Sequence, residues 1–110
     1  LAIGDADVAA AVRAVRERAC EEASLDEILV DIPASRRKLE IGFRRWLGRT
    51  INQERTRARI QRAQQLLRLC RNKTVVEVAV RTGFRSRSRF FQAFRKETGL
   101  TPSQFRQRRA

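Results

Sequence analysis

Apolar residues recur along this chain every three or four positions, the spacing that places them on one face of an α-helix. The pattern predicts about seven helices, over residues 5–19, 25–30, 36–47, 51–71, 75–82 and 87–98, with a short one from residue 102. The longest predicted helix carries its apolar stripe at Ile60, Ala63, Leu67 and Cys70. Residues 75–80 are the one β-like run, and the capping signals around them favour a helix. The fold is therefore predicted to be all-α.

Short polar motifs mark where several of these helices begin. Capping boxes are predicted at residues 24–27, 50–53 and 74–77. In each, a hydroxyl accepts from the backbone N–H three residues on, and a Glu or Gln side chain reaches back to the start of the helix. The residues expected to end helices or make turns are Pro33, Gly48, Gly83 and Gly99.

Two stretches of the chain, residues 24–48 and 74–99, repeat each other. Equivalent residues lie fifty positions apart before the turn and fifty-one apart after it, because the second copy has one extra residue, Arg85. The matched pairs are Ser24/Thr74, Glu27/Glu77, Ile28/Val78, Leu29/Ala79, Ser35/Ser86, Arg36/Arg87, Leu39/Phe90, Phe43/Phe94 and Gly48/Gly99. Each copy is a short capped helix, a tight turn and a longer helix, which is the plan of a helix-turn-helix.

The second helix of such a unit lies in the DNA major groove, where its first turns reach base edges and phosphates. With Leu39 and Phe43, or Phe90 and Phe94, turned inward, polar residues remain on the outward face. The predicted DNA-binding residues are Ser35, Arg36, Arg37, Lys38, Glu40, Thr74, Arg85, Ser86, Arg87, Ser88, Arg89 and Gln92. Two roles are open for Glu40, which either accepts from a base or pairs with Arg36 four residues earlier.

The repeat predicts three parts: a first helix-turn-helix subdomain over 1–50, a linker helix over 51–72, and a second subdomain over 73–110. About twenty helical residues at about 1.5 Å each span roughly 30 Å. Successive turns of the major groove are about 34 Å apart. A monomer is therefore expected to present both recognition helices to adjacent groove segments of an asymmetric site.

Charge strengthens the nucleic-acid interpretation. The chain has 25 Lys and Arg against 12 Asp and Glu, a net charge of +13. Residues 1–34 hold three basic and eight acidic residues, whereas residues 35–110 hold twenty-two and four. Such asymmetry is typical of a surface that binds a polyanion. No apolar run of about 18 residues exists, so no membrane partner is expected.

Composition argues against an enzyme or a metal site. The chain has no His, no Tyr and no Gly-rich phosphate loop. Cys20 and Cys70 lie fifty residues apart without partners at metal-ligand spacing, and we expect both to be buried, apolar thiols. No catalytic residue and no cofactor are predicted. Because the chain begins with Leu and has no Met, we expect it to be part of a longer protein.

Residues 75–106 resemble the C-terminal motif of the AraC/XylS family of bacterial transcription regulators. The matched positions are Val78, Ala79, Gly83, Phe84, Ser88, Phe90, Phe94, Gly99, Thr101, Pro102, Phe105 and Arg106. Arg59, Ala63, Leu66 and Leu67 in the linker are also similar to the family. The first unit departs from the pattern at Leu29, where a small residue is usual, and at Pro33, where the turn Gly is usual.

The resemblance implies a double-stranded DNA-binding output domain that acts at the nucleoid in the cytoplasm. It also implies RNA polymerase as a further partner and an effector-binding domain N-terminal to this chain. Residues 19–20, 28–29 and 35–40 are similar to regulators of xylose operons, which implies control of sugar catabolism.

Two other functions fit the charge. Sequence-specific RNA-binding proteins usually expose aromatic residues for base stacking, whereas Phe43, Trp46, Phe90 and Phe94 lie here at core spacing. A non-specific nucleoid protein would need an apolar wedge, for which Phe91 is the one candidate.

Overall fold

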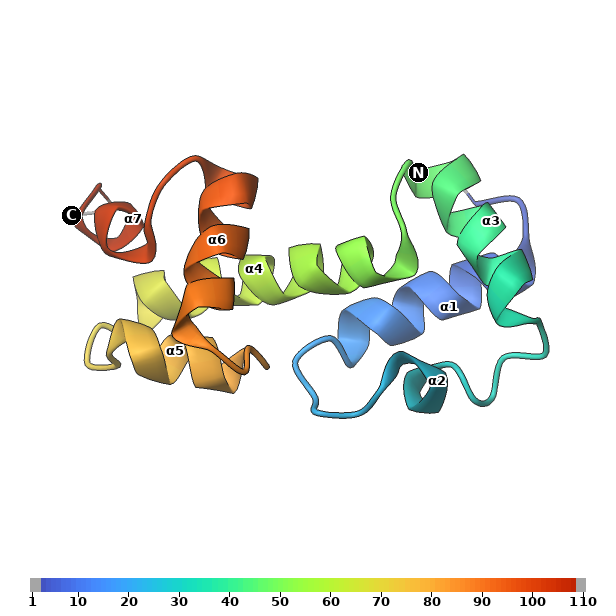
Figure 1. The fold of residues 1–110 in the computed structure, drawn as a ribbon, viewed down its shortest axis with the longest axis horizontal. Helices are drawn as coiled ribbons and strands as arrows, with labels where there is room; N and C mark the ends of the chain where they lie inside the picture. Colours follow the sequence, from blue (N-terminus) through green and yellow to red (C-terminus); the bar gives the residue numbers. More distant parts are fainter. Residues whose placement is uncertain (1–2, 109–110) are drawn as a thin grey trace. The chain divides into compact units, whose positions relative to one another are not determined.

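The computed structural model describes residues 3–108, and this part of the chain is helical without any strand (Figure 1). Its helices are α1 (Ala6–Glu17), α2 (Leu25–Ile28), α3 (Arg36–Leu47), α4 (Ile51–Leu69), α5 (Val75–Arg81), α6 (Arg87–Thr98) and α7 (Pro102–Arg108). The predicted all-α class is confirmed. None of the helices in this range has the length and apolar character needed to cross a membrane.

The predicted helix starts agree with the structure. In α2 and α5, Ser24 and Thr74 accept from the backbone N–H of Glu27 and Glu77, and both glutamates accept in return from the cap backbone. Thr50 and Gln53 form the same reciprocal pair at α4, with distances of 3.0 and 2.8 Å. Gly48 and Gly99 end α3 and α6 with φ of +73° and +78°, a left-handed conformation that glycine adopts without strain.

Three predicted helix ends are wrong by two residues. The first helix stops at Glu17 rather than Ala19. The second helix stops at Ile28 rather than Val30, so Pro33 does not terminate it. Instead the chain turns through bonds from the Ile32 N–H to the Leu29 carbonyl (3.0 Å) and from the Ala34 N–H to the Ile32 carbonyl (2.8 Å). The fourth helix stops at Leu69 rather than Arg71. At its end, the Arg106 guanidinium of α7 donates to the carbonyls of Leu67 and Cys70.

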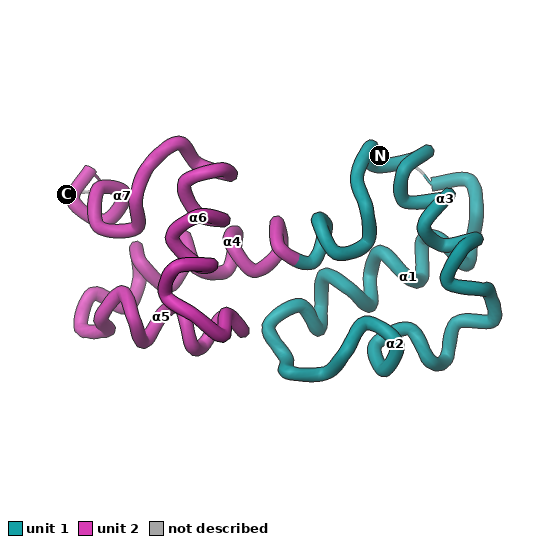
Figure 2. Tube along the Cα trace, in the orientation of Figure 1, with its two compact units in different colours: residues 1–55 teal, residues 56–110 magenta. Residues whose placement is uncertain are grey.

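The chain forms two compact units, residues 1–55 (unit 1) and 56–110 (unit 2), which divide inside α4 (Figure 2). The core of unit 1 contains Val8, Val15, Leu39, Phe43 and Ile51, all almost inaccessible to solvent. The core of unit 2 is more aromatic. Its buried members include Ile60, Leu67, Val78, Phe90 and Phe94. Cys20 and Cys70 are both half-buried, so the expectation that they are buried is wrong.

The structure extends the internal repeat to four helical segments per unit. Three buried residues of α1 correspond to residues of α4 fifty-two positions later: Val8/Ile60, Ala11/Ala63 and Val15/Leu67. The start of α4 corresponds to α7 at the offset of fifty-one: Thr50/Thr101, Gln53/Gln104 and Arg55/Arg106. The first turn of α4 thus closes unit 1 as α7 closes unit 2, while the rest of α4 corresponds to α1. This double use explains why the units divide within one helix.

Candidate DNA-binding site

In unit 2, α5, a glycine turn and α6 form one helix-turn-helix. The Phe84 N–H donates to the Ala79 carbonyl and the Gly83 N–H to the Val80 carbonyl, both at 3.1 Å, which is the Schellman pattern of a helix end. Gly83 has φ of +93°, and a Cβ there would lie 3.0 Å from the Arg59 guanidinium. Both observations explain the glycine, because a larger residue would be strained and crowded.

In unit 1, α2 and α3 form the second helix-turn-helix with a differently built turn. Leu29 ends α2 with φ of −96°, and no residue of the described range other than glycine has positive φ. The turn is made instead by the backbone bonds of residues 29–34, with Pro33 exposed. The departures at Leu29 and Pro33 therefore change the turn while the motif is kept.

The outward face of α6 carries unpaired polar side chains. Phe90 and Phe94 are fully buried, whereas Ser88, Arg89 and Gln92 are exposed. Within residues 3–108, Arg85, Arg89 and Gln92 make no side-chain hydrogen bond or ion pair, and Arg87 lies 5.4 Å from the ring centre of Phe91. A row of exposed donors without internal partners is suited to base edges and phosphates.

Three predicted site residues serve as caps in this structure. The hydroxyls of Ser35, Thr74 and Ser86 accept from the backbone N–H groups of Lys38, Glu77 and Arg89, at about the same distance of 3.1 Å. All three hydroxyls are exposed at helix N-termini. Helix N-termini attract phosphate through their free N–H groups and dipole.

The outward face of α3 differs because most of its charges are paired. Arg36 donates to Asp26 at 2.8 Å and lies 3.5 Å from Glu40. Lys38 lies 3.8 and 3.7 Å from Asp5 and Asp7. The remaining cation of the predicted set here, Arg37, is exposed and has no side-chain partner in the described residues.

Glu40 is less available than its position on the sequence indicated. Besides the pair with Arg36, its Oε1 accepts from the backbone N–H of Ile51 at 3.1 Å. That N–H belongs to the first turn of α4 and has no acceptor within the helix. The carboxylate thus joins the recognition helix to the start of α4, a contact between separate helices that no sequence motif announces.

The aromatic residues support neither alternative function. Phe91 is half-buried, packs on the core of unit 2 and makes an edge contact with Phe90 at 6.1 Å, so it does not project as a wedge. Phe43, Phe90 and Phe94 are inaccessible to solvent, and Trp46 is partly covered by the core and by Arg45. No stacking platform for single-stranded bases is formed by these residues.

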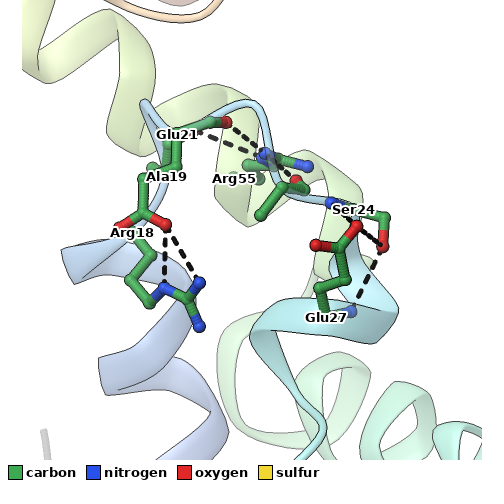
Figure 3. A network of polar contacts seen from close by, with 7 residues as sticks. Arg18, Ala19, Glu21, Ser24, Glu27 and Arg55 are labelled. Carbon is green, nitrogen blue, oxygen red and sulfur yellow. Dashed lines mark hydrogen bonds and ion pairs between the residues drawn. The ribbon is translucent and has the colours of Figure 1, made fainter.

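Sequence analysis missed a set of arginines that bind the protein itself. Arg55 donates to the carbonyls of Ala19, Glu21 and Ala23 at 3.2, 2.7 and 2.6 Å (Figure 3). Burial lowers the pKa of Arg55, an effect that Cys20 and Glu21 oppose, and a guanidinium keeps its charge in proteins. Because its guanidinium is bound to these carbonyls, Arg55 is not available to contact DNA.

Arg106 makes the same kind of contact in unit 2. It donates to the carbonyls of Leu67, Cys70 and Lys73 at 3.2, 3.2 and 2.6 Å. Arg55 and Arg106 are equivalent positions of the repeat at the offset of fifty-one. Extending the sequence comparison past Gly48 and Gly99 would therefore have predicted that the two arginines share a role.

A buried carboxylate, Glu54, is a further internal contact. Its two oxygens accept from Arg16 and Arg49 at 2.7 and 2.6 Å, and the side chain is fully inaccessible. Two arginines compensate the cost of removing this charge from water. The contact joins α1, the α3–α4 turn and α4 within unit 1.

The paired motifs, the exposed cationic helix faces and the buried aromatic core define a double helix-turn-helix DNA-binding domain. A family model described as a helix-turn-helix domain matches residues 31–108. The chain belongs to the AraC/XylS family of DNA-binding transcription regulators.

Relatives and solved structures agree with this assignment. The transcriptional regulator ArgR of Pseudomonas aeruginosa is 34% identical over 81% of this chain and 27% of its own length. The xylose operon regulatory protein of Haemophilus influenzae is 31% identical over 87% and 24%. The chain therefore spans about a quarter of the length of these relatives.

Two solved structures share the fold closely. An AraC-type transcriptional regulator from Chromobacterium violaceum has a TM-score of 0.85 and 31% identity, covering 94% of this chain and 92% of that one. The DNA-binding domain of the global transcriptional factor AdpA, solved with a target DNA, has a TM-score of 0.82 and 29% identity, covering 94% and 93%.

Proposed function

We propose that both recognition helices, α3 and α6, read one asymmetric DNA site, in neighbouring segments of the major groove. The observation that carries this proposal is the common design of the two units. Each buries one face of its second helix, through Leu39 and Phe43 or through Phe90 and Phe94, and exposes cations on the other.

Within this site the residues have different tasks. Arg37, Arg89 and Gln92 are exposed without internal partners and are assigned to base edges, where Arg suits guanine and Gln suits adenine. Arg85 and the capping residues Ser35, Thr74 and Ser86 are assigned to phosphates, together with Ser88. Arg36, Arg87, Lys38 and Glu40 flank the base-reading positions.

Footprinting with single substitutions tests the two-helix proposal. Arg37→Ala is expected to weaken binding and shorten the protected region at one end. Arg89→Ala is expected to weaken binding and shorten the protected region at the other end. Each change should cost about 1–3 kcal/mol and relax base preference at one or two positions. Arg108→Ala is the control, because that residue is exposed at the end of α7, outside the helix-turn-helix. A footprint of unchanged length with Arg37→Ala would show that only unit 2 reads DNA.

We also propose that the intact regulator controls a sugar-catabolic operon, senses its effector through a further N-terminal domain, contacts RNA polymerase and works at the nucleoid in the cytoplasm. Support comes from the xylose operon regulatory protein among the relatives and from their greater length. Transcript levels in cells with the intact gene, with and without xylose, compared with a disrupted gene, test this. Sugar-catabolic transcript levels that stay the same when the gene is disrupted would contradict this proposal.

A further inference from the structure

The two units differ sharply in charge. Unit 1 holds ten basic and ten acidic residues and is neutral, whereas unit 2 holds fifteen basic and two acidic residues, a net charge of +13. The whole excess of positive charge on this chain therefore belongs to unit 2. Because non-specific DNA affinity grows with the number of phosphates neutralised, we expect unit 2 to contribute more of it than unit 1.

The internal repeat shows how this difference arises at the recognition helices. Arg36 of α3 pairs with Asp26 and Glu40. Its counterpart in unit 2, Arg87, has Val76 at the position of Asp26 and Phe91 at the position of Glu40. Val76 is 47% exposed and uncharged, and Phe91 contributes its ring face to Arg87. Both acidic partners of the first recognition arginine are therefore absent from the second unit.

The acidic neighbours of Lys38 are also missing from the equivalent positions of unit 2. These neighbours, Asp5 and Asp7, lie at the start of α1, and the positions fifty-two residues later are Arg57 and Arg59. The acidic residues around α3 are thus replaced in unit 2 by apolar or basic ones. This replacement leaves the cations of α6 open to an external anion.

Resting on the proposed function, we infer that the units divide the work of DNA binding. Unit 2 provides the salt-dependent affinity. In unit 1, Arg36 and Lys38 must give up their ion pairs with carboxylates before they contact DNA. Unit 1 therefore adds sequence selectivity but little affinity for DNA of random sequence. Asp26 is the specificity-determining residue in this exchange, because it holds Arg36 by the shortest of these contacts while remaining 86% exposed.

A reciprocal pair of substitutions tests this inference. Asp26→Asn keeps the side-chain shape and removes the shorter of the two ion pairs of Arg36. It should raise affinity for random-sequence duplex by about 1.4- to fivefold, the range for an exposed ion pair. The log–log salt slope should steepen by at most about 0.9, and the ratio of specific to random-sequence affinity should fall. Val76→Asp places a carboxylate at the position equivalent to Asp26 and should lower affinity by a similar factor with a shallower slope.

Charge-matched controls separate pairing from net charge. Glu17→Gln removes one exposed carboxylate of unit 1 that has no side-chain partner among residues 3–108, and Gln61→Glu adds one on α4. Thermal unfolding of every variant checks that the fold is kept. The inference is overturned if Asp26→Asn matches Glu17→Gln and Val76→Asp matches Gln61→Glu in affinity and slope.

The two-helix proposal and this inference fail differently. If Arg37→Ala shortens the footprint while Asp26→Asn equals its control, both units read DNA and only the division of work is wrong. If Arg37→Ala leaves the footprint unchanged, unit 1 does not read DNA, and both proposals are overturned.

Discussion

Phe94→Ala is expected to unfold unit 2 and abolish DNA binding. Phe94 is fully buried in α6, with ring centres 5.7 Å from Phe90 and 5.5 Å from Phe105. Removing a buried Phe side chain costs about 3–5 kcal/mol through lost burial and the cavity left behind. A unit of about 55 residues has little stability in reserve, so this loss is expected to exceed it.

Thermal unfolding followed by circular dichroism measures this effect, and a gel shift measures DNA binding. Val80→Ala is the control, since that side chain is 67% exposed and its truncation should change stability by less than about 0.5 kcal/mol. A Phe94→Ala chain as stable as the Val80→Ala chain would refute the assigned core.

Arg106→Gln is expected to destabilise the chain by about 2–4 kcal/mol, because three backbone carbonyls lose a charged donor. Arg108→Gln, on the same helix but exposed, should change stability by less than about 0.5 kcal/mol. The two substitutions remove the same charge, so the comparison isolates the internal contacts. Denaturant unfolding measures both.

DNA binding gives this prediction a second test. Because the guanidinium of Arg106 is engaged by the protein, the folded Arg106→Gln chain should keep the salt slope of the parent chain. Arg55→Gln should behave alike in unit 1, where its three carbonyl partners lie in the α1–α2 loop. A shallower slope with unchanged stability would show that these arginines bind phosphate instead.

Local sequence determined most of the secondary structure. The capping pairs Ser24/Glu27, Thr50/Gln53 and Thr74/Glu77 act within four residues, so they could be predicted without knowing the fold. The left-handed ends at Gly48 and Gly99 are equally local. The buried faces followed from the helical spacing of apolar residues, and the internal repeat then predicted two helix-turn-helix units.

Tertiary structure decided how the charged residues are used. On the sequence, Arg36, Arg37, Arg55 and Arg106 are alike. In the structure Arg36 pairs with Asp26, ten residues away, and Arg55 and Arg106 bind carbonyls 32 to 39 residues away. Arg37 alone among these four makes no side-chain hydrogen bond or ion pair within residues 3–108. A long, flexible cationic side chain takes the acceptor that folding brings within reach, and periodicity carries no information about that acceptor.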